Sequence, residues 1–507
     1  MGEFERSRFC KSYEKYISDF DEEEISELTS EIKLLCGING VLFRCKENPC
    51  FFKHIPITLF PTPYPKELFQ FVKLLQQDIN TLLYRVSNDH DFLLTSLEST
   101  AKADPFVQKL TKILEKSKTY NYSQKIQVGI IRSDYMVHDV GSKEKQIKLV
   151  EYNTVSVSFG AHASKIQKIH HDVLEKAKAI SNKCTPTLIV DTSKNKISED
   201  IGLAISTSWI EYAKKYDVGS SCILFVIQDN EQNIFDHAKI ENRALGLISD
   251  CSHSSHKHTI PAIFYVTLRQ LYGKLTVDEV GTLKYCKGTL EVALVYFRAG
   301  YTPSDYVDED CWKTRELIEL SRAIKIPTIG LHLAGCKKIQ QLLTNPDIID
   351  RYLPKEVAQK IMKTFIGTYS LEPGTPEFME ISKKVAENPE NYVLKPQREG
   401  GGNNIYGKEI VELFKSVKTI PNASDSYILM EMIKPTIYRN YLVQSDKEEA
   451  RAAECLSEVG IWGVYVVHEF DVLLNLKSGY LLRTKSSKEL DGGVASGRAV
   501  LDSLCLY

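Results

Sequence analysis

Three consecutive glycines follow a lysine-tipped strand, and this segment is well suited to bind a charged ligand. The strand is Tyr392–Leu394, and Lys395 and Pro396 end it, because proline has no N–H to donate to a ladder. Gly400–Gly402 carry no side chains, so their backbone N–H groups can close on a polyanion. Glu399 would repel phosphate at this place unless a metal ion lay between them. The segment therefore predicts a nucleoside triphosphate site with magnesium.

A second pattern overlaps the glycine triplet. The run Gly402-Asn-Asn-Ile-Tyr-Gly407-Lys408 matches all but the last position of the P-loop, G-x-x-x-x-G-K-[ST]. The last position is Glu409, so the hydroxyl that would bind Mg²⁺ is missing. The residues between the two glycines are also bulky for a loop that wraps phosphates. A P-loop, a plain turn before a helix over residues 409–418 and a metal-assisted phosphate loop all remain open.

Two earlier strand ends carry polar residues in alternation. Arg132-Ser-Asp-Tyr-Met follows one apolar run, and Glu151-Tyr-Asn153-Thr-Val-Ser156-Val-Ser158 ends the next. Residues two apart on a strand share a face, so Glu151 and Asn153 offer two oxygen ligands that suit Mg²⁺. Ser156 and Ser158 would continue toward a substrate as hydroxyl donors. An edge strand with a polar outer face is the alternative, and the pattern alone slightly favours it.

An arginine ends another buried strand, in Tyr296-Phe-Arg298-Ala-Gly300-Tyr301. Ligands of α/β lobes usually bind at the carboxyl ends of the strands. Arg298 would suit a carboxylate there, through bidentate hydrogen bonds. A surface salt bridge explains the same arginine equally well.

Two late strands carry residues that suit a nucleotide. Tyr427–Ile433 holds two methionines, which could sandwich an adenine while the backbone reads its edge, although core packing is the commoner role of such residues. In Leu481-Leu-Arg483-Thr-Lys485, Arg483 and Lys485 share a face and could bind anionic oxygens. A solvated basic face is the alternative.

The cysteines and histidines indicate no nucleophilic enzyme, since no Ser-His-Asp or Cys-His order is legible. The chain has 12 cysteines and no C-x-x-C pair, so reduced and mostly buried thiols are expected. Cys36, Cys45 and Cys50 cluster without the spacing of a zinc site. The tract Cys251–His258 is rich in histidine and could bind a metal, but its Ser and Lys neighbours favour an exposed loop.

Length and composition place the chain among globular enzymes. Its 507 residues are too many for one core, and 43% hydrophobic residues with a net charge of −2 argue against a nucleic-acid-coating protein. No apolar run approaches a membrane span, and the charged start is no signal peptide. Arg6 stands where myristoylation requires Ser or Thr, and Cys505 lies one place too late for prenylation. We expect a cytoplasmic protein that binds neither membrane nor nucleic acid.

The elements that would position these residues follow from periodicity. Helices are predicted over residues 11–35, 68–83, 105–118 and 164–180, a proline-rich connector over 56–65, and strands over 126–132 and 146–152. Strand–helix alternation then runs from Cys222 through 235–247 and 293–297 to 311–323. Helices over about 337–385 precede the glycine triplet, and strands at 427–432, 462–468 and 472–476 follow it. This predicts an α/β fold with a small lobe over residues 222–336, between parts formed by 1–221 and 337–507.

Taken together and in this order, these segments resemble the eukaryotic glutathione synthetases. The likeness runs from Arg132-Ser-Asp-Tyr-Met to the closing Asp491-Gly-Gly-Val-Ala turn, and it is weak in the first hundred residues. Its most specific part combines Lys395-Pro-Gln-Arg-Glu-Gly-Gly-Gly-Asn-Asn with Glu151-Tyr-Asn-Thr and Asn233-Ile-Phe-Asp. The resemblance implies an ATP-grasp fold, in which ATP lies between two antiparallel sheets under a glycine-rich lid. It also implies a homodimer that joins γ-glutamylcysteine to glycine, with ATP converted to ADP and phosphate.

The resemblance also implies roles for individual residues. Magnesium would be held by Glu151, Asn153 and Glu399. Positions around ATP match Glu151, Lys337, Lys395, Glu399, Gly400, Gly401, Gly402, Asn403, Asn404, Tyr406, Met430, Glu431, Met432, Ile433, Glu458, Lys485 and Asp491. Positions around the peptide substrate and glycine match Arg132, Val155, Ser156, Val157, Ser158, Glu231, Gln232, Asn233, His237, Arg298, Ala299, Gly300, Tyr301, Arg483, Val494 and Ala495. Catalytic roles fall to Arg132, Arg483 and Lys395.

One position departs from the family. His237 stands where animal members carry Gln, and an imidazole with an ordinary pKa of about 6.5 would be partly charged near neutral pH. We therefore expect the pKa of His237 to give the peptide's KM a pH dependence between about pH 6 and 7.5. Family members that use β-alanine differ at the pair Val494-Ala495, so this pair predicts glycine as the acceptor.

The implied chemistry needs no protein nucleophile. ATP would phosphorylate the cysteinyl carboxylate, and the amine of glycine would displace phosphate from the acyl phosphate. Mg²⁺, Lys337 and Lys395 would offset charge on the transferred phosphoryl group, while Arg132 and Arg483 steady the intermediate. Two alternatives remain open on the sequence. One is an ATP-grasp ligase with another acceptor amine, and the other is a nucleotide-binding regulatory module without turnover, against which the complete set of metal ligands argues.

Overall fold

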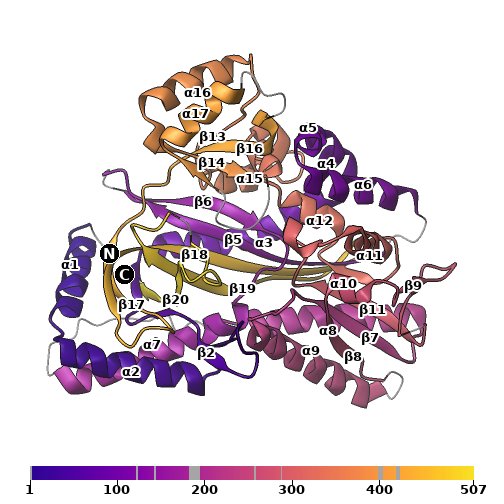
Figure 1. Ribbon diagram of the computed structural model, residues 1–507, viewed down its shortest axis with the longest axis horizontal. Helices are drawn as coiled ribbons and strands as arrows, with labels where there is room; N and C mark the ends of the chain where they lie inside the picture. The colour runs from indigo at the N-terminus through magenta and orange to yellow at the C-terminus, as the bar shows by residue number, and fades with distance from the viewer. Residues whose placement is uncertain are drawn as a thin grey trace.

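The computed structural model describes residues 3–120, 124–141, 144–181, 195–255, 259–286, 288–397, 404–417, 423–490 and 492–507. A seven-stranded sheet crosses the middle of the molecule (Figure 1). Strand β18 pairs with both β17 and β19, so part of the sheet closes on itself. Its strands, in spatial order, are β17 (Tyr438–Val443), β3 (Ile57–Thr58), β20 (Val500–Asp502), β19 (Asp471–Ser486), β18 (Arg451–His468), β5 (Ile126–His138) and β6 (Gln146–Asn153).

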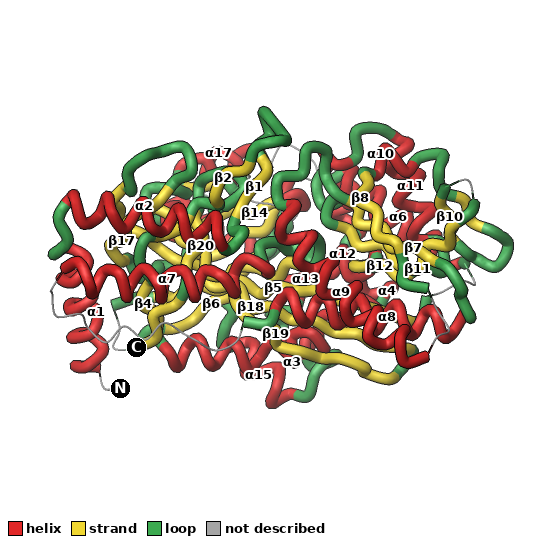
Figure 2. The backbone as a smooth tube through the Cα atoms, turned by 90° about the horizontal axis from the view of Figure 1, so that it is seen from below, coloured by secondary structure: helices red, strands yellow, loops and turns green. Residues whose placement is uncertain are grey.

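Apolar residues cover both faces of this central sheet. Alternate residues of a strand point to opposite faces, so Ile130 and Ile131 fall into two different clusters. One cluster contains Phe69 and Leu82 of helix α3, and the other contains Ile166 of α7 and Ile201 of α8. Figure 2 shows α3 on one side of the strands and α7 on the other.

A second sheet of six strands lies between residues 221 and 326. It contains β8 (Ala262–Val266), β7 (Ser221–Val226), β11 (Leu290–Phe297), β10 (Leu283–Tyr285) and β9 (Thr276–Val277), with β12 (Ile324–Ile326) paired to β11. Strands β7, β8, β11 and β12 run parallel, and β7 is buried throughout, as its continuous apolar run requires. The predicted strand–helix alternation is therefore confirmed.

A third, four-stranded antiparallel sheet carries the lysine-tipped strand. Its order is β13 (Thr368–Tyr369), β16 (Tyr427–Glu431), β14 (Tyr392–Pro396) and β15 (Ile405–Tyr406). Helices α16 and α17 cover one face of it (Figure 1). Phe378 and Phe414 pack together there. Two small sheets complete the strands: β1 (Leu42–Arg44) with β2 (Phe52–His54), and β4 (Thr62–Tyr64) with β21 (Leu504–Leu506).

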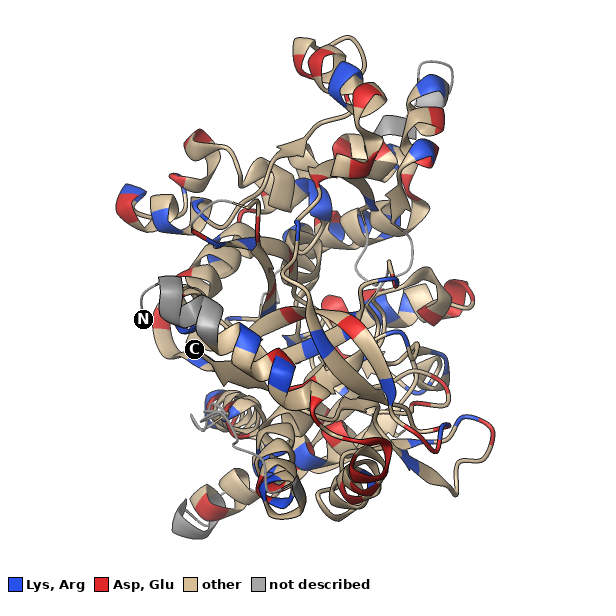
Figure 3. Cartoon of the chain, turned by 90° about the vertical axis from the view of Figure 1, so that its left-hand side faces the viewer, with Lys and Arg blue, Asp and Glu red and all other residues tan. Residues whose placement is uncertain are grey.

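The helices surround these sheets, and charged residues of both signs are interspersed along them in the view of Figure 3. Their bounds are α1 (Glu3–Ser18), α2 (Glu22–Ile38), α3 (Lys66–Asn88), α4 (His90–Ser96), α5 (Glu98–Ala103), α6 (Pro105–Thr119), α7 (Gly160–Ser181), α8 (Ile197–Tyr216), α9 (Ile234–Ser255), α10 (Leu268–Leu271), α11 (Glu309–Glu319), α12 (Ile329–Ala334), α13 (Lys337–Leu342), α14 (Pro346–Ile349), α15 (Lys355–Met362), α16 (Pro376–Glu387) and α17 (Lys408–Val417). Within the described ranges, no helix is long and apolar enough to cross a membrane.

Four of the predicted elements were wrong in extent. The helix predicted over 11–35 is two helices, because Asp21 accepts from the Glu24 N–H while the Glu24 carboxylate accepts from the Asp21 N–H. The proline-rich connector contains strands β3 and β4, where Pro63 lies on a two-stranded edge. The two late strands are far longer than predicted, because β18 and β19 pair with each other along nearly their whole length, including their polar segments.

Candidate active site

Charged and amide side chains form one row across four neighbouring strands of the central sheet. They lie on the same face of the sheet as Ile130 and Trp462. Toward one end of the strands, charged and amide side chains thus replace the apolar side chains of this face. The register places Arg132 beside Asn153, Asp134 beside Glu151, and Glu458 beside Arg483. The row contains Glu151 and Asn153 of β6, Arg132 and Asp134 of β5, Glu458 of β18 and Arg483 of β19.

Asp134 lies fully buried at the centre of this row. Arg132 donates to both of its oxygens, from Nε at 2.7 Å and Nη2 at 2.8 Å. Asn153 Nδ2 and Arg483 Nη2 each donate to its Oδ2 at 2.8 Å. Arg483 also pairs closely with Glu458. One carboxylate therefore joins both predicted catalytic arginines to a predicted metal ligand.

Gly460 makes room for this group from the adjacent strand. It pairs with Asp134 in the β5–β18 register, and a Cβ at this position would stand 2.6 Å from both Arg132 Cδ and Asp134 Oδ1. A side chain here would force the ion pair to move.

Glu151 forms the negative end of the row. Its Oε2 lies 3.0 Å from Lys337 Nζ, at the start of α13. Burial opposes ionisation of Glu151, but the charges of Lys337, Lys395 and Arg483 outweigh it and hold the pKa of this carboxyl well below its usual value. Glu151 is therefore an anion at every pH relevant to the protein.

A bulge in β6 brings Lys395 to the same place. The β5–β6 register slips between Asp134 and Tyr135, which leaves Val150 without a partner on β5. The Val150 carbonyl accepts from Lys395 Nζ at 3.1 Å, so the tip of β14 docks against β6. Burial lowers the pKa of Lys395, and Glu151 opposes this shift.

The carboxyl of Glu458 behaves differently from that of Glu151. Burial raises its pKa, the Arg483 guanidinium opposes the rise, and the negative charges of Asp134 and Glu151 add to it. Burial alone would lower the pKa of Arg483, but Glu458, Asp134 and Glu151 raise it further above its usual value. Arg483 therefore remains a cation in contact with the carboxyl groups of Glu458 and Asp134.

The predicted nucleotide residues of the four-stranded sheet line the face opposite to its helices. Ile366, Val393, Ile428 and Met430 form an apolar cluster there, against which Tyr406, Met432 and Ile433 pack. Glu431 is held by the Tyr369 hydroxyl at 2.7 Å. The remaining predicted residues of the lysine–glycine segment, Glu399, Gly400, Gly401, Gly402 and Asn403, lie outside the described residues, as does Asp491.

The far end of β15 meets the loop after β19. The Tyr406 hydroxyl and Lys485 Nζ donate to the Leu490 carbonyl, at 3.4 and 2.6 Å. Asn404 Nδ2 donates to the Tyr406 hydroxyl at 3.0 Å. The predicted ATP-binding residues Tyr406 and Lys485, from distant segments, are therefore linked through one carbonyl group, and Asn404 joins them through Tyr406.

Arg298 is buried at the end of β11, and its N–H groups are occupied by the protein. Nε donates to His237 Nε2 at 3.1 Å, Nη1 to the Val157 carbonyl and to the Tyr296 hydroxyl at 3.1 Å, and Nη2 to Ser158 Oγ at 2.8 Å. Nη2 also lies 3.5 Å from Asp236 Oδ2. Arg298 therefore ties the six-stranded sheet to the loop after β6, and it is no surface salt bridge.

The expectation of a partly charged His237 is wrong. The imidazole is only 1% exposed, and burial, together with the nearby Arg298 cation, lowers its pKa to about 3. Because Nε2 accepts a hydrogen bond from an arginine, the single proton of the neutral ring is on Nδ1. His237 is a neutral hydrogen-bond acceptor for Arg298, and its ring lies parallel to Tyr265.

The loop that Arg298 holds is strained. Ser156 and Phe159 adopt φ values of 52° and 73°, a region that residues other than glycine rarely enter. The Ser156 hydroxyl donates to the Phe297 carbonyl, and the Phe159 N–H donates to Asp236. The predicted segment Val155, Ser156, Val157 and Ser158 is thus fixed by contacts with β11 and α9, as expected where binding geometry is imposed.

The remaining predicted substrate residues surround the same corner. Glu231 accepts from the Asn233 N–H at 2.8 Å, and Gln232 contacts Arg44 of β1 through the backbone and its side chain. The N–H groups of Gly300 and Tyr301 donate to Asp305 Oδ2 after Ala299. Gly300 has φ of 93°, which favours glycine. In the closing turn, Val494 is buried and Ala495 is exposed.

Comparisons with known proteins agree with this geometry. The family model described as "Eukaryotic glutathione synthase, ATP binding domain" matches residues 22–506. Glutathione synthetase of Xenopus laevis is 36% identical over 489 residues, which cover 95% of this chain and 96% of that protein. The chain belongs to the eukaryotic glutathione synthetase family. This result confirms the resemblance drawn from the motifs. It also confirms that the chain is an ATP-binding ligase of glutathione biosynthesis.

Other members of the glutathione synthetase family also match this chain over most of its length. The human enzyme is 36% identical, over 95% of this chain and 97% of that protein, and the chloroplastic enzyme of Solanum lycopersicum is 35% identical, over 96% and 85%. A solved structure of a glutathione synthetase-like effector from Globodera pallida, in its apo form, matches with a TM-score of 0.73 at 19% identity. It covers 96% of this chain and 98% of its own, which supports the fold.

Three buried residues of this glutathione synthetase family member escaped the sequence analysis. Asp134 could have been found, because it lies two residues from Arg132 on one strand and shares its face. Asp236 accepts from the N–H groups of Phe159 and Ala161, which only the fold brings near. Gln397 accepts from the Lys338 N–H at 2.8 Å and so joins the root of the glycine segment to α13.

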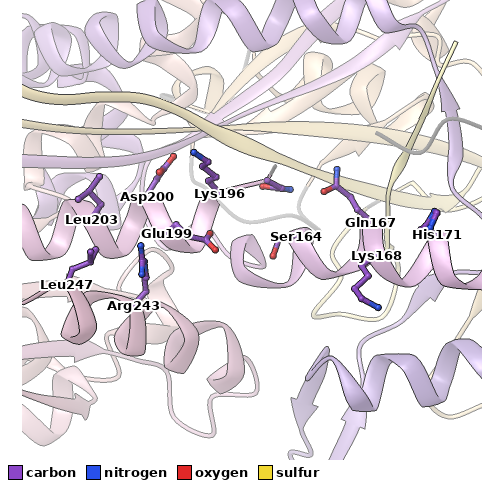
Figure 4. A pocket seen from close by; sticks show the side chains of 11 residues that line it. Ser164, Gln167, Lys168, His171, Lys196, Glu199, Asp200, Leu203, Arg243 and Leu247 are labelled. Carbon is purple, nitrogen blue, oxygen red and sulfur yellow. The ribbon is translucent and has the colours of Figure 1, made fainter. Parts of the chain in front are cut away.

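A sizeable cavity lies away from this site. It has a volume of about 680 Å³ and is lined from α7, α8 and α9, including Lys168, Glu199 and Arg243 (Figure 4). None of the predicted site residues lines it.

Proposed function

We propose that this chain is a glutathione synthetase that phosphorylates the cysteinyl carboxylate of γ-glutamylcysteine with ATP and then joins it to glycine. The observation that carries the proposal is the docking of β14 onto β6, which brings Lys395 to the row of arginines and carboxylates, where Lys337 of α13 contacts Glu151. Cations from two sheets thus converge where a polyanion would reside.

We also propose an ATP-grasp arrangement, with ATP between the four-stranded sheet and the central sheet. The apolar face formed by Val393, Met430 and Met432 suits an adenine, because flat bases pack on aliphatic and thioether groups. The glycine triplet keeps its predicted role as a lid over the phosphates. The division into parts 1–221, 222–336 and 337–507 also remains our proposal, and the six-stranded sheet supports the middle part.

Magnesium fits the described residues. Glu151 is held ionised. The Asn153 amide nitrogen points toward Asp134, so the amide oxygen points away from Asp134 and can bind a cation. Among the described residues, no three His, Cys, Asp or Glu side chains gather as metal ligands, and the third proposed ligand, Glu399, lies outside them. When bound, Mg²⁺ would neutralise charge on the phosphates of ATP.

The chain's own residues suit the two chemical steps. Lys337 and Lys395 would offset charge on the γ-phosphoryl group while a carboxylate oxygen of the dipeptide forms a bond to phosphorus and ADP leaves. Arg132 and Arg483 would hold the acyl phosphate. The amine of glycine would then attack the carbonyl carbon, the bond to the phosphate oxygen would break, and the amine would lose a proton.

The dipeptide would bind at the corner formed by β11 and the strained serine loop. We propose that Arg298 acts there chiefly by holding Val157 and Ser158 in place, because its N–H groups are already engaged within the protein. Val494 and Ala495 would leave room for glycine and exclude the longer β-alanine.

We propose a homodimer in the cytosol. Large apolar side chains are exposed on α2 and the β1–β2 hairpin, and exposed apolar patches mark contact surfaces. They are Leu34, Ile38, Phe51 and Phe52, with exposures from 51% to 71%. The described cysteines are all free, as a reducing compartment would keep them.

The proposed function is tested with purified protein, ATP, Mg²⁺ and γ-glutamylcysteine, while the acceptor amine is varied. We expect phosphate release and glutathione formation with glycine, and little release with β-alanine. Phosphate release with β-alanine but not glycine would show a ligase with another acceptor. Phosphate release with neither amine would indicate a nucleotide-binding protein without turnover.

A matched pair of variants tests the phosphate site. Lys337→Ala removes the cation that contacts Glu151, whereas Lys338→Ala removes its neighbour on the same helix, whose Nζ donates to Gln341. We expect Lys337→Ala to lower kcat at least about 100-fold, as removal of a transition-state donor does, and Lys338→Ala to change it little. Equal effects of the two variants would contradict the assigned role of Lys337.

A further inference from the structure

Asp134 collects hydrogen bonds from groups that the reaction needs in fixed positions. It is fully buried, and its oxygens accept from Arg132, Arg483 and the Asn153 amide. Its own oxygens therefore have three partners in the site and are enclosed by them, so Asp134 itself is poorly placed to touch a substrate.

The two arginines need such a partner, because they carry like charges and come from different strands. Arg132 is on β5 and Arg483 is on β19, with β18 between them. The bidentate contact fixes the plane of the Arg132 guanidinium, and the contact at 2.8 Å from Arg483 Nη2 places the second guanidinium beside it. A carboxylate between two guanidinium groups permits both to remain close together.

Asp134 also sets the orientation of the Asn153 amide. An ionised carboxylate only accepts hydrogen bonds, so the amide atom at 2.8 Å from Asp134 Oδ2 must be the nitrogen. The amide oxygen then faces away from Asp134. Asn153 would otherwise be free to turn its nitrogen toward a cation and repel it.

We propose that Asp134 is the positioning residue of this ligase site, which aims both arginines at the acyl phosphate and turns the Asn153 oxygen toward the metal. This inference rests on the proposed function, and it adds a residue that couples metal binding to the placement of the arginines. Partners that orient metal ligands typically change metal affinity or activity by about 10- to 100-fold when they are replaced.

The test replaces the carboxylate by its isosteric amide, Asp134→Asn, which brings an NH₂ group against the donors of both arginines. We expect kcat to fall by about 10- to 100-fold, with a rise of similar size in the Mg²⁺ concentration that gives half-maximal activity. A second readout needs no turnover: calorimetric binding of a non-hydrolysable ATP analogue at graded Mg²⁺, in which the variant should require more Mg²⁺ than the wild type.

A second variant perturbs the group without changing its charge. Gly460→Ala would place a Cβ at 2.6 Å from Arg132 Cδ and Asp134 Oδ1, so it should displace the pair and shift the Mg²⁺ dependence in the same direction. Asp502→Asn is the matched control, because Asp502 is a buried aspartate of the same sheet that accepts from the hydroxyls of Thr62 and Thr484. It should leave the Mg²⁺ dependence unchanged.

The inference is overturned if Asp134→Asn and Gly460→Ala keep the wild-type Mg²⁺ dependence, or if Asp502→Asn shifts it equally. Thermal unfolding of each variant gives the folded fraction by which kcat is normalised. If the wild type makes no glutathione, the proposed function fails, while the analogue titration still tests the role of Asp134.

Discussion

His237 provides the sharpest test of the site, because the sequence and the structure lead to opposite expectations. The sequence predicts a partly charged imidazole, whereas the structure buries it as a neutral acceptor for Arg298 at 3.1 Å, with its pKa lowered to about 3. Between about pH 6 and 7.5, which brackets the reference imidazole pKa, the ring then does not titrate. The KM for γ-glutamylcysteine should owe no pH dependence to His237 in this range.

Two substitutions separate the acceptor from the charge. In His237→Leu, the buried Arg298 Nε–H loses its partner, and a hydrogen bond to a charged group contributes about 1.5–3 kcal/mol. If all of this free energy is lost from substrate binding, KM rises about 10- to 150-fold, since about 1.4 kcal/mol corresponds to a factor of ten. In His237→Gln, the amide oxygen can accept the same bond, so KM should stay within about threefold of the wild type.

The assay measures initial rates at saturating ATP and glycine with varied γ-glutamylcysteine, across the same pH range. Thermal unfolding of both variants shows whether the loss is confined to substrate binding. The reasoning is refuted if the wild-type KM rises as the pH falls below about 6.5 and this rise disappears in His237→Gln, because the imidazole would then titrate in the folded protein.

Three further predictions concern the metal, acid stability and assembly. Glu151→Gln removes a half-buried anion beside Lys337 and Lys395, and we expect ATP turnover to fall about 10- to 100-fold. An unchanged turnover would contradict the metal assignment. His162, His170, His237 and His332 are buried with their pKa values lowered to between about 3 and 4, so the unfolded chain binds more protons than the folded chain below the ordinary pKa of about 6.5. Stability should therefore fall as the pH drops from about 6.5 toward 4, although Asp502, whose pKa is raised to about 6, opposes the change. Urea unfolding at a series of pH values should show that unfolding takes up protons near pH 5.5. Phe51→Ser with Phe52→Ser should shift the sedimentation velocity from dimer to monomer, whereas Met379→Ser, an equally exposed apolar residue on α16, should not.

The predicted elements agree with the structure where local pattern decides. Helix α3 was predicted over 68–83 and spans Lys66–Asn88, and β7 and β11 of the middle lobe were predicted from the strand–helix alternation, whereas β8 and β12 were not. The failures lie where a local pattern is ambiguous. The first half of β18 mixes charged, polar and small residues without strict alternation, so only its pairing with β17 and β19 makes it a strand.

The predictions for the candidate site show the same difference between local and long-range information. Glu151 with Asn153, and Arg483 with Lys485, were identified because residues two apart on a strand must share a face. The protonation of His237 and the engagement of Arg298 could not be identified, because a pKa depends on burial and on neighbouring charges that come from distant segments.

The sequence by itself determined the types of chemistry available: a lysine-tipped strand before a glycine triplet, alternating oxygen-bearing side chains that suit a metal, arginines at strand ends and the family to which the chain belongs. These are local patterns, and covalent spacing along a strand or loop fixes them. Only the tertiary structure decided which groups meet. The slip at Val150 brings Lys395 onto β6, and the pairing of β5 with β6 and β18 encloses Asp134 between two arginines and an amide. Burial within the fold, rather than residue type, then sets the charge of each group.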